Sequence, residues 1–194
     1  MEGNTTHANL DSIINRSILC RVFPDLKNDE NFQILSPQTY IYNCIAWAMQ
    51  FEDRWVDIVD EPGCWWPDGV EKTMLPSALI QAFEAVGFTL CDNSHLEENF
   101  DKVVLYKNVD NDEWTHAARI VSETTEHSKF GPSFDGTHSH NVLCNTGVGF
   151  ENQSYGVAYA FMKRSKTFHL PEESLSGNIE TDLDLLRRLL GMQR

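Results

Sequence analysis

The period of the hydrophobic pattern changes along this chain, and the order of the two patterns limits the folds it can adopt. Residues 40–52 and 75–86 carry apolar side chains at helical spacing, and Gly87 supplies a stop signal for the second run. Residues 102–161 then hold shorter apolar runs separated by polar turn residues, which is typical of antiparallel strands. Helices followed by strands predict an α+β domain.

The composition divides the chain into three segments. Residues 1–30 are predicted to be an N-terminal extension, residues 31–163 the main domain, and residues 164–194 a linker and an amphipathic helix. In that helix acidic residues come early and basic residues late, as the helix dipole prefers. Its apolar face is formed by Ile179, Leu183, Leu186 and Leu190.

The charge of the chain bears on its partners. The 194 residues carry a formal net charge of -14, which should repel phosphate backbones, so nucleic acid is not an expected partner. A cationic substrate, a basic protein partner and plain solubility are all compatible with this charge. No apolar run reaches the ~18 residues of a membrane span, so none is expected.

The cysteines and the N-terminus bear on the compartment. Five cysteines, an odd number, are widely spaced and include no CxxC pair, which favours reduced thiols over a disulfide framework. The first residues lack the basic and apolar parts of a signal peptide. A cytoplasmic location is therefore predicted, and export by a specialised secretion system stays open as an alternative.

Cys44 is the first candidate for chemistry, because it follows Asn43 at the start of an apolar, helix-prone run. A helix N-terminus and a nearby imidazole both lower the pKa of a thiol, which makes the thiolate a better nucleophile. The alternative is a buried structural cysteine, since free cysteine packs as a small hydrophobe.

His116 is the candidate general base. It begins the apolar run 116–121, where a strand head would face the start of the helix. The alternative is an inert histidine on a partly buried strand. A third group should orient the imidazole, and Ser128 lies at a plausible distance for the next antiparallel strand, although serine orients more weakly than Asp or Asn. The other candidates for this role are Asp135, His138, His140 and Asn141.

Further residues are candidates for binding. The Gln38 amide, with the backbone N–H of Cys44, is predicted to stabilise an oxyanion, and a plain loop glutamine is the alternative. Trp65 and Trp66 would either wall a substrate cleft or cap the core, and Asn43 is placed with them as a substrate contact.

One segment carries residue types that can bind zinc. The segment with His138, His140 and Cys144, together with His127, offers zinc ligands, but its spacing matches no closed structural site. We therefore predict no metal and no cofactor.

Several motifs occur together and in order: Asn43-Cys44-Ile45-Ala46-Trp47-Ala48, Trp65-Trp66-Pro67, Thr115-His116-Ala117-Ala118-Arg119, Ser128-Lys129-Phe130-Gly131 and Tyr155-Gly156. They resemble an uncharacterised, mostly bacterial family with the pattern NCIAWA, WWP, HAAR, SKLG and a late YG. The resemblance spans about residues 40–163. That family in turn resembles papain-like cysteine hydrolases, which include NlpC/P60 peptidases, amidases and transglutaminase-like enzymes.

This resemblance implies a fold and a set of roles. The fold would be papain-like, with N-terminal helices packed on an antiparallel sheet plus a C-terminal helix, and the main domain 31–163 would be the papain-like domain. Cys44 would be the nucleophile, His116 the base, and Ser128 would stand near the third polar residue of NlpC/P60 proteins.

Two functions follow from these patterns. The first is a cysteine-dependent hydrolase acting on an amide bond of a protein or peptide, as a peptidase, amidase or deamidase, and in one version as a bacterial toxin or effector. The second is a non-enzymatic acidic binding protein, such as an immunity protein or adaptor, on a papain-like fold. Its partner would meet the acidic surface or the C-terminal helix.

Overall fold

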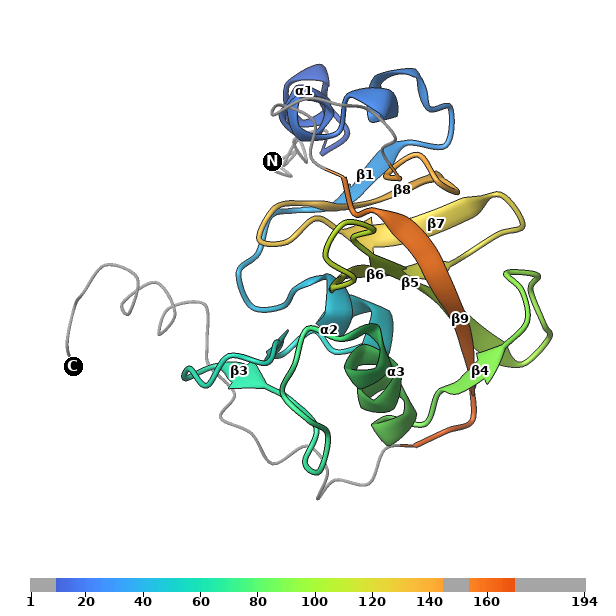
Figure 1. Cartoon of the computed structure of the whole chain (residues 1–194). Coiled ribbons are helices and arrows are strands. Elements are labelled where there is room, and N and C mark those ends of the chain that lie inside the picture. The colour runs from blue at the N-terminus through green and yellow to red at the C-terminus, as the bar shows by residue number, and fades with distance from the viewer. Residues whose placement is uncertain (1–9, 145–153, 170–194) are drawn as a thin grey trace, which may run out of the picture.

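The computed structural model describes residues 10–144 and 154–169, and within them one antiparallel sheet dominates the molecule (Figure 1). The sheet has seven strands in the order β1-β8-β7-β6-β5-β9-β4. The strands are β1 (Gln33–Ser36), β4 (Thr89–Cys91), β5 (Phe100–Lys107), β6 (Trp114–Ile120), β7 (Thr125–Lys129), β8 (Asp135–Ser139) and β9 (Val157–Ser165).

The helices are short and lie in two places. Helices α2 (Cys44–Met49) and α3 (Pro76–Ala85) cover one face of the sheet, beside a small parallel pair of strands, β2 (Trp55–Val56) and β3 (Cys64–Trp65). Helix α1 (Ile13–Val22) and the 3-10 helix η1 (Pro24–Asn28) lie at the opposite end of the molecule, next to β1.

The papain-like fold that the sequence predicted is wrong. In the described residues a seven-stranded antiparallel sheet is the main element, and the helices are few and short. The apolar run 40–52 yields only the six residues of α2, because Gln50 adopts a left-handed φ of 70° and ends the helix. The predicted C-terminal helix lies outside the described residues.

Side-chain alternation explains the long central strands. Along β5, Val103 and Leu105 face the core under α2 and α3, while Val104 and Tyr106 belong to a cluster on the other face. Each face of the strand is therefore buried, as the runs of apolar residues in β5 require. No helix among the described residues is long and apolar enough to cross a membrane.

Strands β6 and β7 separate part-way along, and this opening positions the candidate site. They are paired at Arg119↔His127 and Ile120↔Glu126, whereas β5 and β6 are paired from Lys102↔Ile120 to Lys107↔Trp114. Helix α2 packs against both β6 and β7. The start of α2 therefore lies near residues that β6 and β7 would otherwise use to pair with each other.

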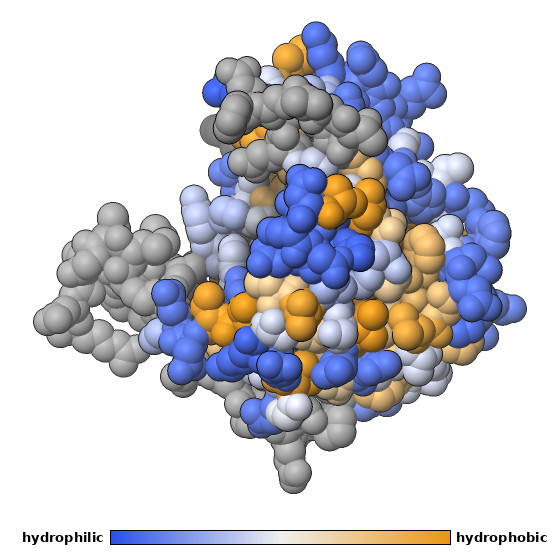
Figure 2. Space-filling model, in the orientation of Figure 1, coloured by the Kyte–Doolittle hydropathy of each residue, from blue (hydrophilic) through white to orange (hydrophobic). Residues whose placement is uncertain are grey.

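A second apolar cluster ties the N-terminal helices to the sheet. It brings together Leu19, Phe23, Leu26, Phe32, Ile34, Phe130, Phe134 and Leu143. Elsewhere the surface is mixed: on the face shown in Figure 2, hydrophilic residues surround smaller groups of hydrophobic ones.

Candidate functional site

Cys44 is the first residue of α2, and Asn43 fixes that position. The Asn43 Oδ1 accepts a hydrogen bond from the Ala46 N–H at 3.0 Å, which satisfies a free donor of the first helical turn. The Asn43 Nδ2 donates to the Val56 carbonyl at 2.8 Å. The side chain is buried, so Asn43 anchors the helix start to β2.

The Cys44 thiol is protonated at neutral pH. Burial raises its pKa to about 11, although hydrogen bonds from the backbone N–H groups of Ala117, Ile45 and Cys44 itself, and the charge of Lys129, act in the opposite direction. A cysteine at a helix N-terminus is expected to favour the thiolate. Here burial outweighs a helix of only six residues.

His116 is fully buried and neutral. Its Nε2 lies 2.9 Å from Ser128 Oγ, and its ring stacks on Tyr155 with centroids 3.7 Å apart. Burial, followed by the charge of His138, lowers the His116 pKa well below its ordinary 6.5. Its other ring nitrogen, Nδ1, is buried and has no hydrogen-bond partner among residues 10–144 and 154–169.

Cys44, His116 and Tyr155 share one small region. The thiol meets the backbone N–H of Ala117, the residue after His116 on β6. Tyr155 stacks on His116, and its pKa is raised by burial and then by the nearby Cys44. The arrangement therefore offers a neutral thiol, a neutral imidazole and an aromatic ring over that imidazole.

Ser128 lies between two histidines. Its Oγ is 2.9 Å from His116 Nε2 and 2.8 Å from His138 Nε2. The His138 Nδ1 is 3.0 Å from the carbonyl oxygen of Ser139. The structure therefore brings the predicted base His116 and the predicted orienting residue Ser128 together, and it places His138, one of the alternatives for that role, directly behind Ser128.

The remaining predicted residues, Gln38, Trp65 and Trp66, make contacts of their own. Gln38 is exposed and its amide donates to Ser133 Oγ at 3.3 Å. Trp66 is buried and stacks on Trp114 with centroids 6.0 Å apart, while Trp65 meets Phe51 edge to face. Their roles in oxyanion and substrate binding stay predictions.

Lys129 is a residue of the site region that sequence reasoning missed. Its ammonium donates to the carbonyls of Thr39 at 3.2 Å, Gly131 at 2.6 Å and Ser133. Burial lowers its pKa to about 8. The sequence did offer a signal for it, because a lysine in a strand that continues into the apolar Phe130 is expected to need buried hydrogen-bond partners. Through these hydrogen bonds Lys129 joins the turn after β7 to the segment that leads into α2.

A second polar group lies on the same face of the sheet. The Tyr106 hydroxyl donates to Glu126 Oε2 at 2.5 Å, and His140 Nδ1 is 2.8 Å from Glu126 Oε1. The hydrogen bond with Glu126 raises the pKa of His140. No group of three or more His, Cys, Asp or Glu in the described part of the chain is arranged to hold a metal ion.

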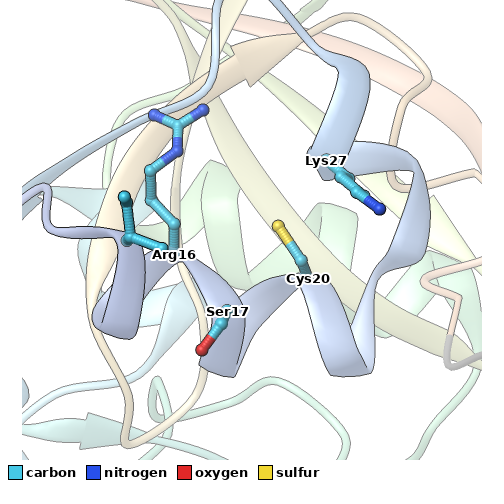
Figure 3. A pocket seen from close by; sticks show the side chains of 5 residues that line it. Arg16, Ser17, Cys20 and Lys27 are labelled. Carbon is cyan, nitrogen blue, oxygen red and sulfur yellow. The ribbon is translucent and has the colours of Figure 1, made fainter.

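The cavity shown in Figure 3 does not belong to this site. It has a volume of about 240 Å³ and is lined by Ile13, Arg16, Ser17, Cys20 and Lys27, from α1 and η1. The Arg16 guanidinium is already engaged with Asp11 at 3.2 Å and with the Phe32 carbonyl at 2.6 Å. None of the residues around Cys44 lines this cavity.

Comparison with known proteins gives one match. No curated protein and no solved structure matches the chain. The resemblance to the NCIAWA/WWP/HAAR family and to papain-like hydrolases therefore stays a prediction. A family model matches residues 33–163, which is more than half of the chain and includes Cys44, His116 and Ser128. The protein belongs to the family described as Domain of unknown function (DUF7689).

Proposed function

We propose that this protein is a cysteine-dependent hydrolase that acts on an amide bond of a protein or peptide, with Cys44 as nucleophile and His116 as base. The observation that carries the proposal is the buried Nδ1 of His116, which has no hydrogen-bond partner in the described part of the chain. His116 precedes Ala117, whose N–H meets the Cys44 thiol. A buried nitrogen without a partner costs free energy, and a proton-accepting role accounts for it.

The reaction has two halves. Cys44 Sγ attacks the carbonyl carbon while its proton passes to His116 Nδ1, and the C–N bond then breaks as the amine takes that proton. Water next attacks the thioester and gives a proton to Nδ1. The C–S bond breaks, the acid leaves, and the proton returns to Sγ.

The resting protonation states decide the order of proton transfer. With the pKa of Cys44 raised to about 11 and that of His116 lowered well below 6.5, a preformed ion pair is disfavoured at neutral pH. Proton transfer therefore accompanies the attack. The N–H of Cys44 would donate to the oxyanion, and Gln38 would join it only after leaving Ser133.

Alkylation by iodoacetamide, followed by peptide mapping, tests the pair. An unassisted thiol of pKa about 11 is ionised to only about one part in 10⁴ at pH 7. We expect Cys44 to react faster than this fraction allows, and we expect the excess to disappear in His116→Ala. Cys20 and Cys144 serve as internal controls, because burial raises the pKa of both.

A screen of peptide and side-chain amides completes the test, with Cys44→Ala as the control. Thermal unfolding of each variant checks that it is folded. A Cys44 rate that rises only as the pH approaches 11, and that is the same in His116→Ala, would rule out the base. An amidase activity that survives in Cys44→Ala would rule out the nucleophile.

One observation favours the second candidate function, a non-enzymatic binding protein. Cys44 is half-buried, and its raised pKa leaves it a weak nucleophile at rest. If neither base-assisted alkylation nor amide hydrolysis is found, this function gains support. A binding screen with basic proteins would then follow from the net charge of -14.

A further inference from the structure

We propose that His138 is a positioning residue that acts through Ser128 and fixes which nitrogen of His116 carries the proton. The inference deepens the proposed function and rests on it for its catalytic meaning. It is drawn from a continuous row of hydrogen bonds that runs from His116 through Ser128 and His138 to the backbone of β8.

The backbone carbonyl at the end of this row determines which atom donates and which accepts in each of its hydrogen bonds. The Ser139 carbonyl can only accept a hydrogen bond, so the His138 Nδ1, 3.0 Å away, must carry a proton. Burial lowers the pKa of His138, which favours the neutral ring. A neutral ring has a single N–H, so His138 Nε2 presents a lone pair to Ser128.

Because Ser128 donates to His138, it must accept a hydrogen bond from His116. Its hydroxyl has one proton, which it donates to His138 Nε2 at 2.8 Å. The Oγ lone pairs then face His116 Nε2 at 2.9 Å, and this nitrogen must donate. The neutral His116 ring therefore holds its proton on Nε2 and keeps a lone pair on Nδ1, the buried atom for which the described residues supply no hydrogen-bond partner.

If every donor and acceptor in the row were exchanged, His116 Nδ1 could not act as a base. If His138 carried its proton on Nε2, its Nδ1 lone pair would face the Ser139 carbonyl, and two acceptors would repel each other. Ser128 would then donate to His116 Nε2 and the proton of His116 would sit on Nδ1. A histidine that already holds a proton on Nδ1 cannot take one there from Cys44.

A clamp from the N-terminal segment holds the end of the row in place. The Ser139 N–H donates to Asp29 Oδ2 at 2.7 Å, and the Ser139 hydroxyl donates to Asp29 Oδ1 at 2.5 Å. The Asn31 amide donates to the same Ser139 hydroxyl at 2.9 Å. The carbonyl that orients His138 is therefore part of a fixed backbone.

The test uses two variants of the full chain. His138→Gln can still offer an acceptor to Ser128, whereas His138→Leu offers none. Imidazole ¹⁵N chemical shifts distinguish the two neutral tautomers. We expect His116 to carry its proton on Nε2 in the wild type and in His138→Gln, and to become a mixture of tautomers in His138→Leu.

The alkylation rate supplies a second readout. The base-assisted rate of Cys44 should fall about tenfold in His138→Leu, a part of the ~10²–10⁴-fold that a positioned base supplies, and His138→Gln should restore it. A purely structural role for His138 would change stability in both variants and leave the His116 tautomer unchanged, which would overturn the proposal.

The two proposals fail in different ways. A wild-type His116 with its proton on Nδ1 overturns the row, even if His138→Leu does not fold. A wild-type His116 with its proton on Nε2, together with no base-assisted alkylation of Cys44, leaves the row standing and removes the hydrolase.

Discussion

Two rows of polar side chains lie side by side on one face of the sheet and differ mainly in their central group. The Ser128 row contains His116, Ser128 and His138, and the Glu126 row contains Tyr106, Glu126 and His140. Strand β7 supplies both central residues, two positions apart, so they point to the same face. The final histidines, one on β8 and one directly after it, are also two positions apart.

The central group decides the charge of its neighbours. In the Glu126 row the carboxylate raises the pKa of His140, and the pKa of Tyr106 is raised by burial and then by Glu126. In the Ser128 row a neutral hydroxyl offers no such compensation, so burial lowers the pKa of both His116 and His138. The same strand thus supplies the centre of a carboxylate–histidine pair and, two residues further on, the centre of a row of neutral histidines.

Exchanging the central group should produce the largest effect. In Ser128→Asp a carboxylate replaces the hydroxyl between the two histidines, which should raise the pKa of His116 and favour a Cys44 thiolate beside an imidazolium. We expect iodoacetamide labelling of Cys44 at pH 7 to increase at least about tenfold, since each unit of pKa lowering gives tenfold more thiolate. Peptide mapping measures this rate.

The matched control is Ser128→Asn, which has the same size and no charge. Both variants should lose about 1–3 kcal/mol of unfolding free energy, because Ser128 is fully buried and the larger side chain must be fitted. Equal labelling of Cys44 in the two variants would show that charge at the centre does not control this row.

Removing the charge of the other row should have the next largest effect. Glu126→Gln should lower the unfolding free energy by about 2 kcal/mol near pH 6, because two hydrogen bonds to a buried carboxylate lose their charge. Glu123→Gln is the control: this exposed carboxylate pairs with His95 and should change stability far less than Glu126→Gln does. Urea unfolding measures both, and equal losses would contradict the contrast.

The two rows should also give opposite dependences on pH. His140 has a raised pKa, so its stabilisation is complete below 6.5 and is lost as the pH rises through the raised value. His116 and His138 have lowered pKa values, so the unfolded chain takes up protons first and stability falls as the pH drops below 6.5. Glu126→Gln should flatten the loss at high pH and deepen the loss at low pH, because the charge of Glu126 also counteracts the lowering of the His138 pKa.

The smallest effect is expected from Tyr106→Phe, which removes one donor and keeps the charge of Glu126. We expect a loss of about 1 kcal/mol in unfolding free energy and a pKa of His140 that stays raised, since the His140–Glu126 hydrogen bond remains. NMR titration of His140 measures the second point. Tyr159→Phe, which loses a hydrogen bond to the Pro76 carbonyl, is the control that should leave His140 unchanged. A His140 pKa that returns to its ordinary value in Tyr106→Phe would show that the tyrosine sustains the pair.

The start of α2 and the pairing of His116 with Ser128 could be predicted from local signals. Asn43 before an apolar run is an N-cap signal, and the cap is present. A hairpin of two strands explains the spacing between His116 and Ser128, because β6 and β7 are antiparallel neighbours. These features depend on residues close together in sequence.

Strand β8, and with it the place of His138, could not be predicted. Its sequence Asp135-Gly136-Thr137-His138-Ser139 has no apolar residue and lacks the alternation that marks a strand. It is a strand because β7 and β1 pair with its two sides. Gly136 permits this, since a Cβ there would lie 2.4 Å from the Gln33 carbonyl. Such long-range pairing leaves no local signal.

The sequence also could not predict that the pKa of Cys44 is raised and not lowered. A cysteine at a helix start and a histidine on a strand do not reveal how deeply each is covered. For His116 the covering residue is Tyr155, which is distant in sequence and stacks on its ring. The predicted fold failed for a related reason, because the length of α2 depends on the left-handed backbone at Gln50.

The clamp formed by Asp29 and Asn31 has a consequence for the modular unit that this family shares. The family match begins at residue 33, yet both clamp residues come before it. A fragment cut at the boundary of sequence similarity would keep Cys44, His116, Ser128 and His138 and lose the anchor that holds Ser139. The unit that fixes Ser139 therefore extends beyond the residues that the family model matches.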